Sequence, residues 1–236
     1  MVLAMTESGL AGVNLATGAV IRTANGDDCG VESASDHRNS LGEPIYPYDV
    51  VRVSLSDYPQ LADPSQPEAA ETVGKPVPDR RLAARRTQRI IKSLLAPDTE
   101  PLLGFVGQST CYWTLTGDHP SVALVELVRP PVLYWQDRDG QPAVRFSWGA
   151  RQEWLLCQDP LAIAVLQASG ARHLGGENLS RALGFQPSHL VVTLTPPKEG
   201  YCYKVVSSLL PKPAQAAKMS TTRRKRSEAK RATVAS

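Results

Sequence analysis

Apolar and polar residues alternate with a period of two through the second half of the chain, and this pattern predicts a series of β-strands. Short turns such as DRDG and GA separate the runs, as in hairpins. The runs expected to form strands are 121–128, 131–136, 142–148, 151–157, 189–195 and 201–209. We expect at least five of them to pair antiparallel. A helix is predicted before the last two strands, because Asp159 suits an N-cap and Pro160 suits the first helical position.

The first half of the chain shows fewer regular patterns. Strands are predicted over 18–24 and 48–57, where alternation is clear. Residues 58–79 contain five prolines and are expected to form an irregular excursion. The segment 80–95 has a helical apolar stripe, and Asp79 before it is a candidate N-cap.

Composition narrows the class of protein. Hydrophobic residues make up 42% of the 236 residues, enough for a core, and no run approaches the roughly 18 apolar residues of a membrane span. The first residues lack a basic start, so we expect a soluble, cytoplasmic protein with no membrane partner. The four cysteines lie far apart without a CxxC pair, which predicts free, mostly buried thiols, no metal site and no cofactor.

Charge is distributed unevenly along the chain. Residues 212–236 hold eight Lys or Arg and one acid, a net charge of +7. The whole chain carries +3, which leaves −4 for residues 1–211, with 18 basic against 22 acidic residues. The segment 212–236 has few large apolar side chains, so we expect a disordered basic tail.

Three stretches of the second half resemble a known family. GYCYKVV (200–206) follows LVVTLTPP (190–197), and EWLLCQDP (153–160) precedes the predicted helix. These words resemble the dual OB-containing domain of bacterial proteins. The likeness covers mainly 121–211, and the N-terminal half is similar in layout only: of the opening Ser-Arg-Lys-like signature it keeps Ser8 at most.

The resemblance implies a mainly β protein of two OB-like β-barrels with a helical insertion and a disordered basic C-terminal tail. The first barrel would span 1–118, with the irregular and helical insertion at 58–97. The second would span 119–211, and the tail 212–236. The resemblance also implies a link to nucleic-acid binding or to a defence or modification system, without a proven reaction.

Basic residues are the main candidates for contacts with nucleic acid. The stretch 80–92 contains six basic residues in 13 positions and no acid. An unpaired basic helix face attracts phosphate, although a solvated face is the commoner role, and acids elsewhere such as Glu68 or Glu71 could pair with these arginines. The residues proposed to bind nucleic acid are Arg81, Arg85, Arg89, Lys92, Lys204, Arg223, Arg224, Lys225 and Arg226.

Aromatic residues on strands offer a second kind of contact. Tyr201 and Tyr203 alternate with Cys202 and Lys204, and a tyrosine beside a lysine could stack a base and bind its phosphate, although packing is the commoner role of strand aromatics. Further candidates for an exposed ring are Tyr134, Trp135, Phe146, Trp148 and Trp154. Alternation places Phe146 and Trp148 on one face, but does not say which face is outside.

The chain contains no phosphate-binding loop, dinucleotide fingerprint, HExxH, GxSxG or deaminase signature. We therefore expect a nucleic-acid-binding module for DNA or RNA, single-stranded by preference, rather than an enzyme. It could serve a bacterial defence or nucleic-acid modification system and a partner protein there. The alternatives are a nucleic-acid-processing enzyme without a recognisable motif, and a protein-interaction adaptor.

Overall fold

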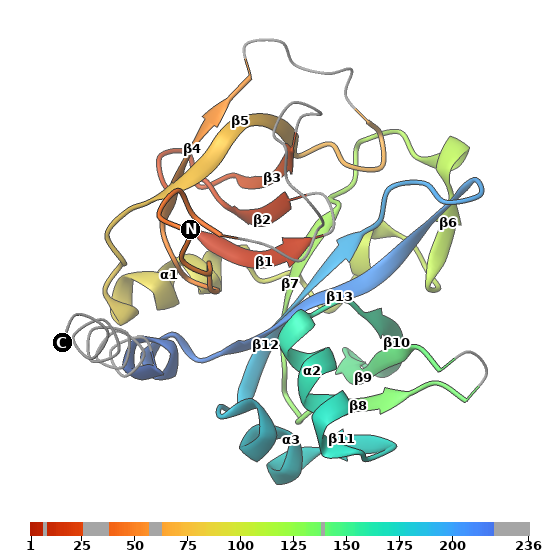
Figure 1. Cartoon of the computed structure of the whole chain (residues 1–236). Helices are drawn as coiled ribbons and strands as arrows, with labels where there is room; N and C mark the ends of the chain where they lie inside the picture. The colour runs from red at the N-terminus through yellow and green to blue at the C-terminus, as the bar shows by residue number, and fades with distance from the viewer. Residues whose placement is uncertain (7–8, 26–37, 57–62, 138–139, 220–236) are drawn as a thin grey trace, which may run out of the picture.

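The computed structural model describes residues 1–236 except 7–8, 26–37, 57–62, 138–139 and 220–236. The described chain is mainly β, as predicted, with two sheets and few helices. The first sheet occupies the upper part of Figure 1 and the second sheet the lower right part. No described helix has the length and apolar character needed to cross a membrane.

The N-terminal sheet has five strands in the order β1-β2-β3-β5-β4. The strands are β1 (Val2–Thr6), β2 (Gly9–Val13), β3 (Val20–Asn25), β4 (Val51–Leu55) and β5 (Ala69–Pro78). β3 and β5 are parallel, and the other neighbours are antiparallel. The Val2 N–H donates to the carbonyl of Asp49 at 2.9 Å, and the Val2 carbonyl accepts from the Tyr48 N–H at 2.8 Å. The chain that enters β4 therefore runs beside β1.

The second sheet has the order β11-β8-β9-β10-β13-β12-β7, and β6 pairs with the first residues of β13. Its strands are β6 (Ser109–Cys111), β7 (Val122–Glu126), β8 (Val132–Trp135), β9 (Pro142–Trp148), β10 (Arg151–Cys157), β11 (His173–Gly175), β12 (Pro187–Leu194) and β13 (Tyr201–Pro211). All six predicted strands of this half are confirmed. Their antiparallel pairing is confirmed too, except that β10 and β13 are parallel.

The described helices include α1 (Ala84–Leu94), α2 (Pro160–Ser169) and α3 (Gly176–Leu183), with 3-10 turns η2 (Leu102–Gly104) and η3 (Tyr112–Thr114). The predicted Asp159 cap of α2 is confirmed. The predicted Asp79 cap of α1 is wrong, because the helix begins four residues later and Ala83 occupies the cap position. Asp79 instead accepts a hydrogen bond from the Arg80 N–H at 2.7 Å.

Two further predictions about the chain are corrected by the structure. Residues 69–78, expected to be irregular, form β5, because hydrogen bonds to β3 and β4 on its two sides outweigh its proline and glycine content. Residues 213–219, expected to be disordered, are helical, with Ala216 in a buried cluster and Met219 against another. The small apolar side chains of this helix pack on existing surface, which composition alone does not reveal.

The two sheets share buried side chains. One cluster, which includes Leu3, Tyr48, Ile91, Leu124 and Leu210, draws on both sheets and on α1. A larger cluster joins side chains of the second sheet to side chains of α2 and α3. Among the described cysteines, Cys157 and Cys202 are buried free thiols and Cys111 is half-buried, as predicted; Cys29 lies outside the described residues.

The Asp159 carboxylate ties α2 to the second sheet. One oxygen accepts from the N–H groups of Leu161 and Ala162 at 2.8 and 3.1 Å, and the other accepts from the Leu209 N–H in β13 at 2.6 Å. Asp159 is buried, and burial raises the pKa of its carboxyl while the three N–H groups oppose that rise. The chain leaving β10 is thereby fixed to the strand that runs parallel to it.

We expect Asp159→Asn to lower the free energy of unfolding by about 1–3 kcal/mol, because the amide sets an N–H donor against the buried Leu209 N–H. Urea denaturation measures the change. Asp137→Asn is the matched control: it alters an exposed ion pair with Arg172 and should change stability by less than about 1 kcal/mol. Equal effects of the two substitutions would contradict the role given to Asp159.

Candidate nucleic-acid interface

Alternation along β8, β9 and β10 sorts their side chains onto two faces of the sheet. Leu133, Val144, Phe146, Trp148 and Leu155 belong to the buried cluster and define the inner face. The residues between them therefore point outward. This settles which aromatic set is outside: Phe146 and Trp148 pack inside, and Trp135 leans on the same cluster.

The outward residues form registered rows across the three strands. Arg145 of β9 lies between Val132 of β8 and Trp154 of β10. In the neighbouring row, Tyr134 of β8 lies directly opposite His173 of β11. We call the set Tyr134, Arg145, Trp154 and His173 the outer face. Trp154 is 46% exposed, so this face shows a large ring to solvent beside a cation.

Electrostatics agree with this geometry. Burial raises the pKa of the Tyr134 hydroxyl, and the positive charge of nearby Arg145 opposes the rise. Arg145 is exposed and, within the described part of the chain, enters no ion pair. Its charge is therefore available to an anion. A ring and an unpaired guanidinium directly opposite each other suit a base and its phosphate.

The basic stretch around α1 divides into two parts. Arg85, Arg89 and Lys92 are exposed on α1, and none of them pairs with an acid among the residues that the structure describes. The opposite side of α1 packs Ile90, Ile91 and other apolar residues against the shared cluster. These three predicted contacts thus lie on a solvent-facing cationic surface, which we call the α1 face.

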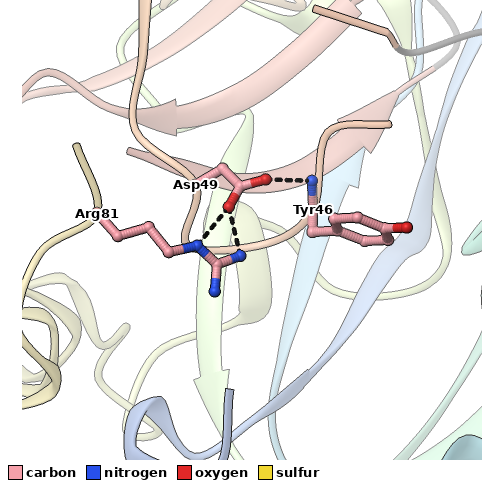
Figure 2. Close-up of polar contacts among 3 residues, drawn as sticks. All are labelled: Tyr46, Asp49 and Arg81. Atoms are coloured by element: carbon pink, nitrogen blue, oxygen red, sulfur yellow. Dashed lines mark hydrogen bonds and ion pairs between the residues drawn. The ribbon is translucent and has the colours of Figure 1, made fainter. Parts of the chain in front are cut away.

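Arg81 does not belong to the α1 face. It precedes the helix, and its Nε donates to Oδ1 of Asp49 at 2.6 Å, while a terminal nitrogen forms an ion pair with the same oxygen (Figure 2). The other Asp49 oxygen accepts from the Tyr46 N–H at 2.8 Å. The prediction of one face made by Arg81, Arg85 and Arg89 is therefore wrong, because a carboxylate distant in sequence takes Arg81.

Neither acid suggested as a partner for these arginines takes that role in the described contacts. Glu68 instead accepts from the backbone N–H and the hydroxyl of Ser121, at 2.9 and 2.6 Å. Its backbone carbonyl accepts from the Arg22 N–H, so Glu68 helps to join the segment before β7 to the first sheet.

Lys204 also lies away from the outer face. Only 2% of its surface is exposed, and its Nζ donates to the Phe105 carbonyl at 2.5 Å while lying 4.0 Å from the centre of that ring. Burial lowers the pKa of the Lys204 ammonium to about 8, and the charge of Glu153 partly restores it. The predicted phosphate contact is withdrawn, because this ammonium holds the segment around Phe105 on the inner side of β13.

The remaining predicted contacts, Arg223, Arg224, Lys225 and Arg226, lie outside the described residues. A groove of about 680 Å³ connects the end of α1 to the β9–β10 hairpin, lined by Leu95 on one side and Ser147 and Gln152 on the other. Arg129 and Arg151 line it together with Asp98 and Glu126, so its charges balance. The residues of the outer face and of the α1 face lie outside the lining of this groove.

A separate cavity of about 280 Å³ lies between residues 44–47, the start of α2 and the helix 213–219. Its charged lining consists of Arg38, Arg81 and Asp159. Arg38 donates to the Gly42 carbonyl, Arg81 is engaged by Asp49, and Asp159 is engaged by three backbone N–H groups. Among the described residues, no cluster of three or more His, Cys, Asp or Glu could hold a metal ion. The cavity gives the enzyme alternative no specific support.

No family model matches the chain, and no curated protein or solved structure matches it either.

The lowered pKa of Lys204 predicts a pH dependence of stability. The unfolded lysine has a pKa near 10.5 and the folded one about 8, so between these values the unfolded chain binds more protons and stability rises with pH. Melting temperatures of the wild type and Lys204→Met at pH 7.5 and pH 10 isolate this group. We expect the melting temperature of the wild type to rise relative to that of the variant between pH 7.5 and pH 10. A constant difference between the two melting temperatures would contradict the assignment.

The α1 face predicts a uniform, salt-dependent effect on binding. Changing Arg85, Arg89 and Lys92 together to Ala should weaken binding equally across sequences and flatten the log–log salt slope by about 0.7 for each lost phosphate contact to a single strand. Arg81→Ala is the matched control, and should lower stability by about 1 kcal/mol without changing the slope. Affinity across salt and urea denaturation measure both, and an unchanged slope in the triple variant would exclude the α1 face.

Proposed function

We propose that this protein is a nucleic-acid-binding module of two OB-like units, and that its second unit binds single strands on the outer face. The observation that carries the proposal is the exposed Trp154 ring directly opposite the unpaired Arg145. OB-type units bind oligonucleotides on the face of their second and third strands.

Strand order supports two OB-like units. In an OB unit the five strands follow the order 1-2-3-5-4, with the third strand parallel to the fifth. The first sheet has that order, β1-β2-β3-β5-β4, and β3 is parallel to β5. In the second sheet β8-β9-β10-β13-β12 repeats it, β10 is parallel to β13, and α2 and α3 lie between the third and fourth strands.

Contacts between the first and fourth strands support barrel-like closure of each unit. In the first unit, Val2 of β1 exchanges hydrogen bonds with Tyr48 and Asp49, just before β4. In the second unit, β7 pairs with β12 and β8 pairs with β9. Because β8 follows β7 directly in the chain, the two together act as one bent first strand that contacts both the fourth and the second strand.

The two units differ in the surface that their second strand offers. All five residues of β2 are buried, so the first unit has no open face on that strand. β9 and β10 of the second unit are its second and third strands, and their outward side carries Arg145, Trp154 and Gln152. We therefore assign ligand binding to the second unit and a phosphate-binding role to the α1 face.

A ring that stacks a base needs that base unpaired, so the proposed ligand is single-stranded DNA or RNA. A role as an accessory of a bacterial defence or nucleic-acid modification system stays a prediction of the family resemblance.

The outer face predicts the effect of removing one ring. Trp154→Leu should weaken binding of a labelled single-stranded oligonucleotide about tenfold, because a base–aromatic stack contributes about 1–3 kcal/mol, whereas Trp154→Phe should keep most of the affinity. Arg145→Ala should lower affinity and flatten the salt slope by about 0.7. Fluorescence anisotropy across salt measures these changes.

Leu161→Ala is the control for these variants, because Leu161 on α2 is exposed to a similar extent as Trp154 but lies off the outer face. It should bind as the wild type does. Affinity for a duplex equal to that for the single strand, or no loss in Trp154→Leu at an unchanged melting temperature, would contradict the proposed function.

A further inference from the structure

A second exposed aromatic group lies at the tip of the β12–β13 hairpin. Trp113 of η3 is 70% exposed and Tyr201 at the start of β13 is 42% exposed. Their ring centres are 6.2 Å apart and the planes are inclined at 58°. Exposed single apolar residues are ordinary, but two large rings in contact at a hairpin tip form a contiguous apolar patch.

The backbone is shaped to present these rings. Gly200 has φ of +82°, and a Cβ there would lie 2.9 Å from Trp113, so the indole ring rests on a position that only glycine leaves open. Lys198 and Tyr201 exchange backbone hydrogen bonds at 2.8 and 3.0 Å, which closes the turn and holds an exposed lysine beside the pair. The arrangement is thus two rings beside a turn that carries the exposed Lys198 and the exposed Glu199.

The segment that contains β6 connects the outer face to this pair of rings. The Gln108 side chain donates to the Trp154 carbonyl at 2.7 Å, and the next residues pair with β13 until Cys111 lies opposite Tyr201. Three residues of extended chain cover about 10 Å, so the pair begins about three stacked nucleotides beyond Trp154. Tyr203, half-buried, lies between them on the same side of β13 as Tyr201.

We propose that Trp113 and Tyr201 form a second base-stacking station, reached by single strands that extend past the outer face, with Lys198 beside it for a phosphate. The inference rests on the proposed function and adds a direction to the ligand's path. A strand enters between β8 and β10 and leaves along β6 toward the hairpin tip. Nucleic acid is favoured over a protein partner because the pair is continuous with the ring and cation of the outer face.

Strand length separates the two stations. Oligo-dT of two nucleotides spans about 7 Å and covers the outer face alone, whereas fifteen nucleotides reach the hairpin tip. Anisotropy at low salt compares both probes on the wild type, Trp113→Leu, Trp113→Phe, Tyr201→Leu and Trp154→Leu, with melting temperatures as a check on folding. We expect Trp113→Leu and Tyr201→Leu each to lower the affinity for the long probe about tenfold and to leave the affinity for the short probe unchanged. Trp113→Phe should bind almost as the wild type does.

The other outcomes distinguish a failure of the second station from a failure of the proposed function. If Trp154→Leu loses affinity while Trp113→Leu and Tyr201→Leu match the wild type on both probes, the second station is wrong and the proposed function stands; the pair then suits a protein partner. An equal loss on short and long probes would overturn the separate station. If the wild type binds neither probe, the proposed function is overturned and this inference with it.

Discussion

The buried Asp159 carboxylate is the contact on which the second unit depends. β10 and β13 are parallel neighbours, and parallel strands require a crossover between them. The crossover begins at α2, immediately after β10, and Asp159 fixes its first turn to the Leu209 N–H of β13. A carboxylate in an apolar setting is costly unless it is hydrogen-bonded, and here three N–H groups meet that need. The position of β10, and with it Trp154, follows from this anchor.

The junction between the two sheets is polar as well as apolar. The Arg22 guanidinium of β3 is buried and donates to the Leu194 carbonyl of β12 at 2.6 Å, and the Tyr48 hydroxyl donates to the Pro211 carbonyl at 2.9 Å. Burial lowers the pKa of Arg22 to about 10, and the charges of Glu68 and Asp63 oppose the fall. The first contact joins β3 to β12, and the second joins the segment before β4 to the end of β13, so both tie the first sheet to the second.

The second half of the fold was predictable because its signals are local. Alternation identified every strand from β7 to β10, and the Asp159–Pro160 pair identified the start of α2. β5 was not predictable in this way, since its strand state comes from two partners rather than from its own composition. The helix 213–219 was missed for a related reason, because the surface that accepts Ala216 comes from elsewhere in the chain.

The candidate site was predicted in part. The sequence offers Trp154 and Tyr134 as possible exposed rings. Burial of the alternate residues places both on the outward side, where Trp154 is exposed and Tyr134 is half-buried. The sequence predicts phosphate contacts at Arg81 and Lys204. It does not reveal their actual partners, Asp49 and the Phe105 carbonyl, because these lie 32 and 99 residues away in sequence. No local signal marked Trp113, since its exposure depends on the fold of the hairpin tip.

Photo-crosslinking tests the central claim most directly. A single-stranded DNA carrying 5-iodouracil is irradiated with the full chain, and the crosslinked peptides are mapped by mass spectrometry. The account predicts crosslinks at Tyr134 and Trp154, whose rings lie on the side of the sheet where Arg145 is available to phosphate. Crosslinks confined to the first sheet or to the cavity beside residues 44–47, with none on β8–β10, would contradict it.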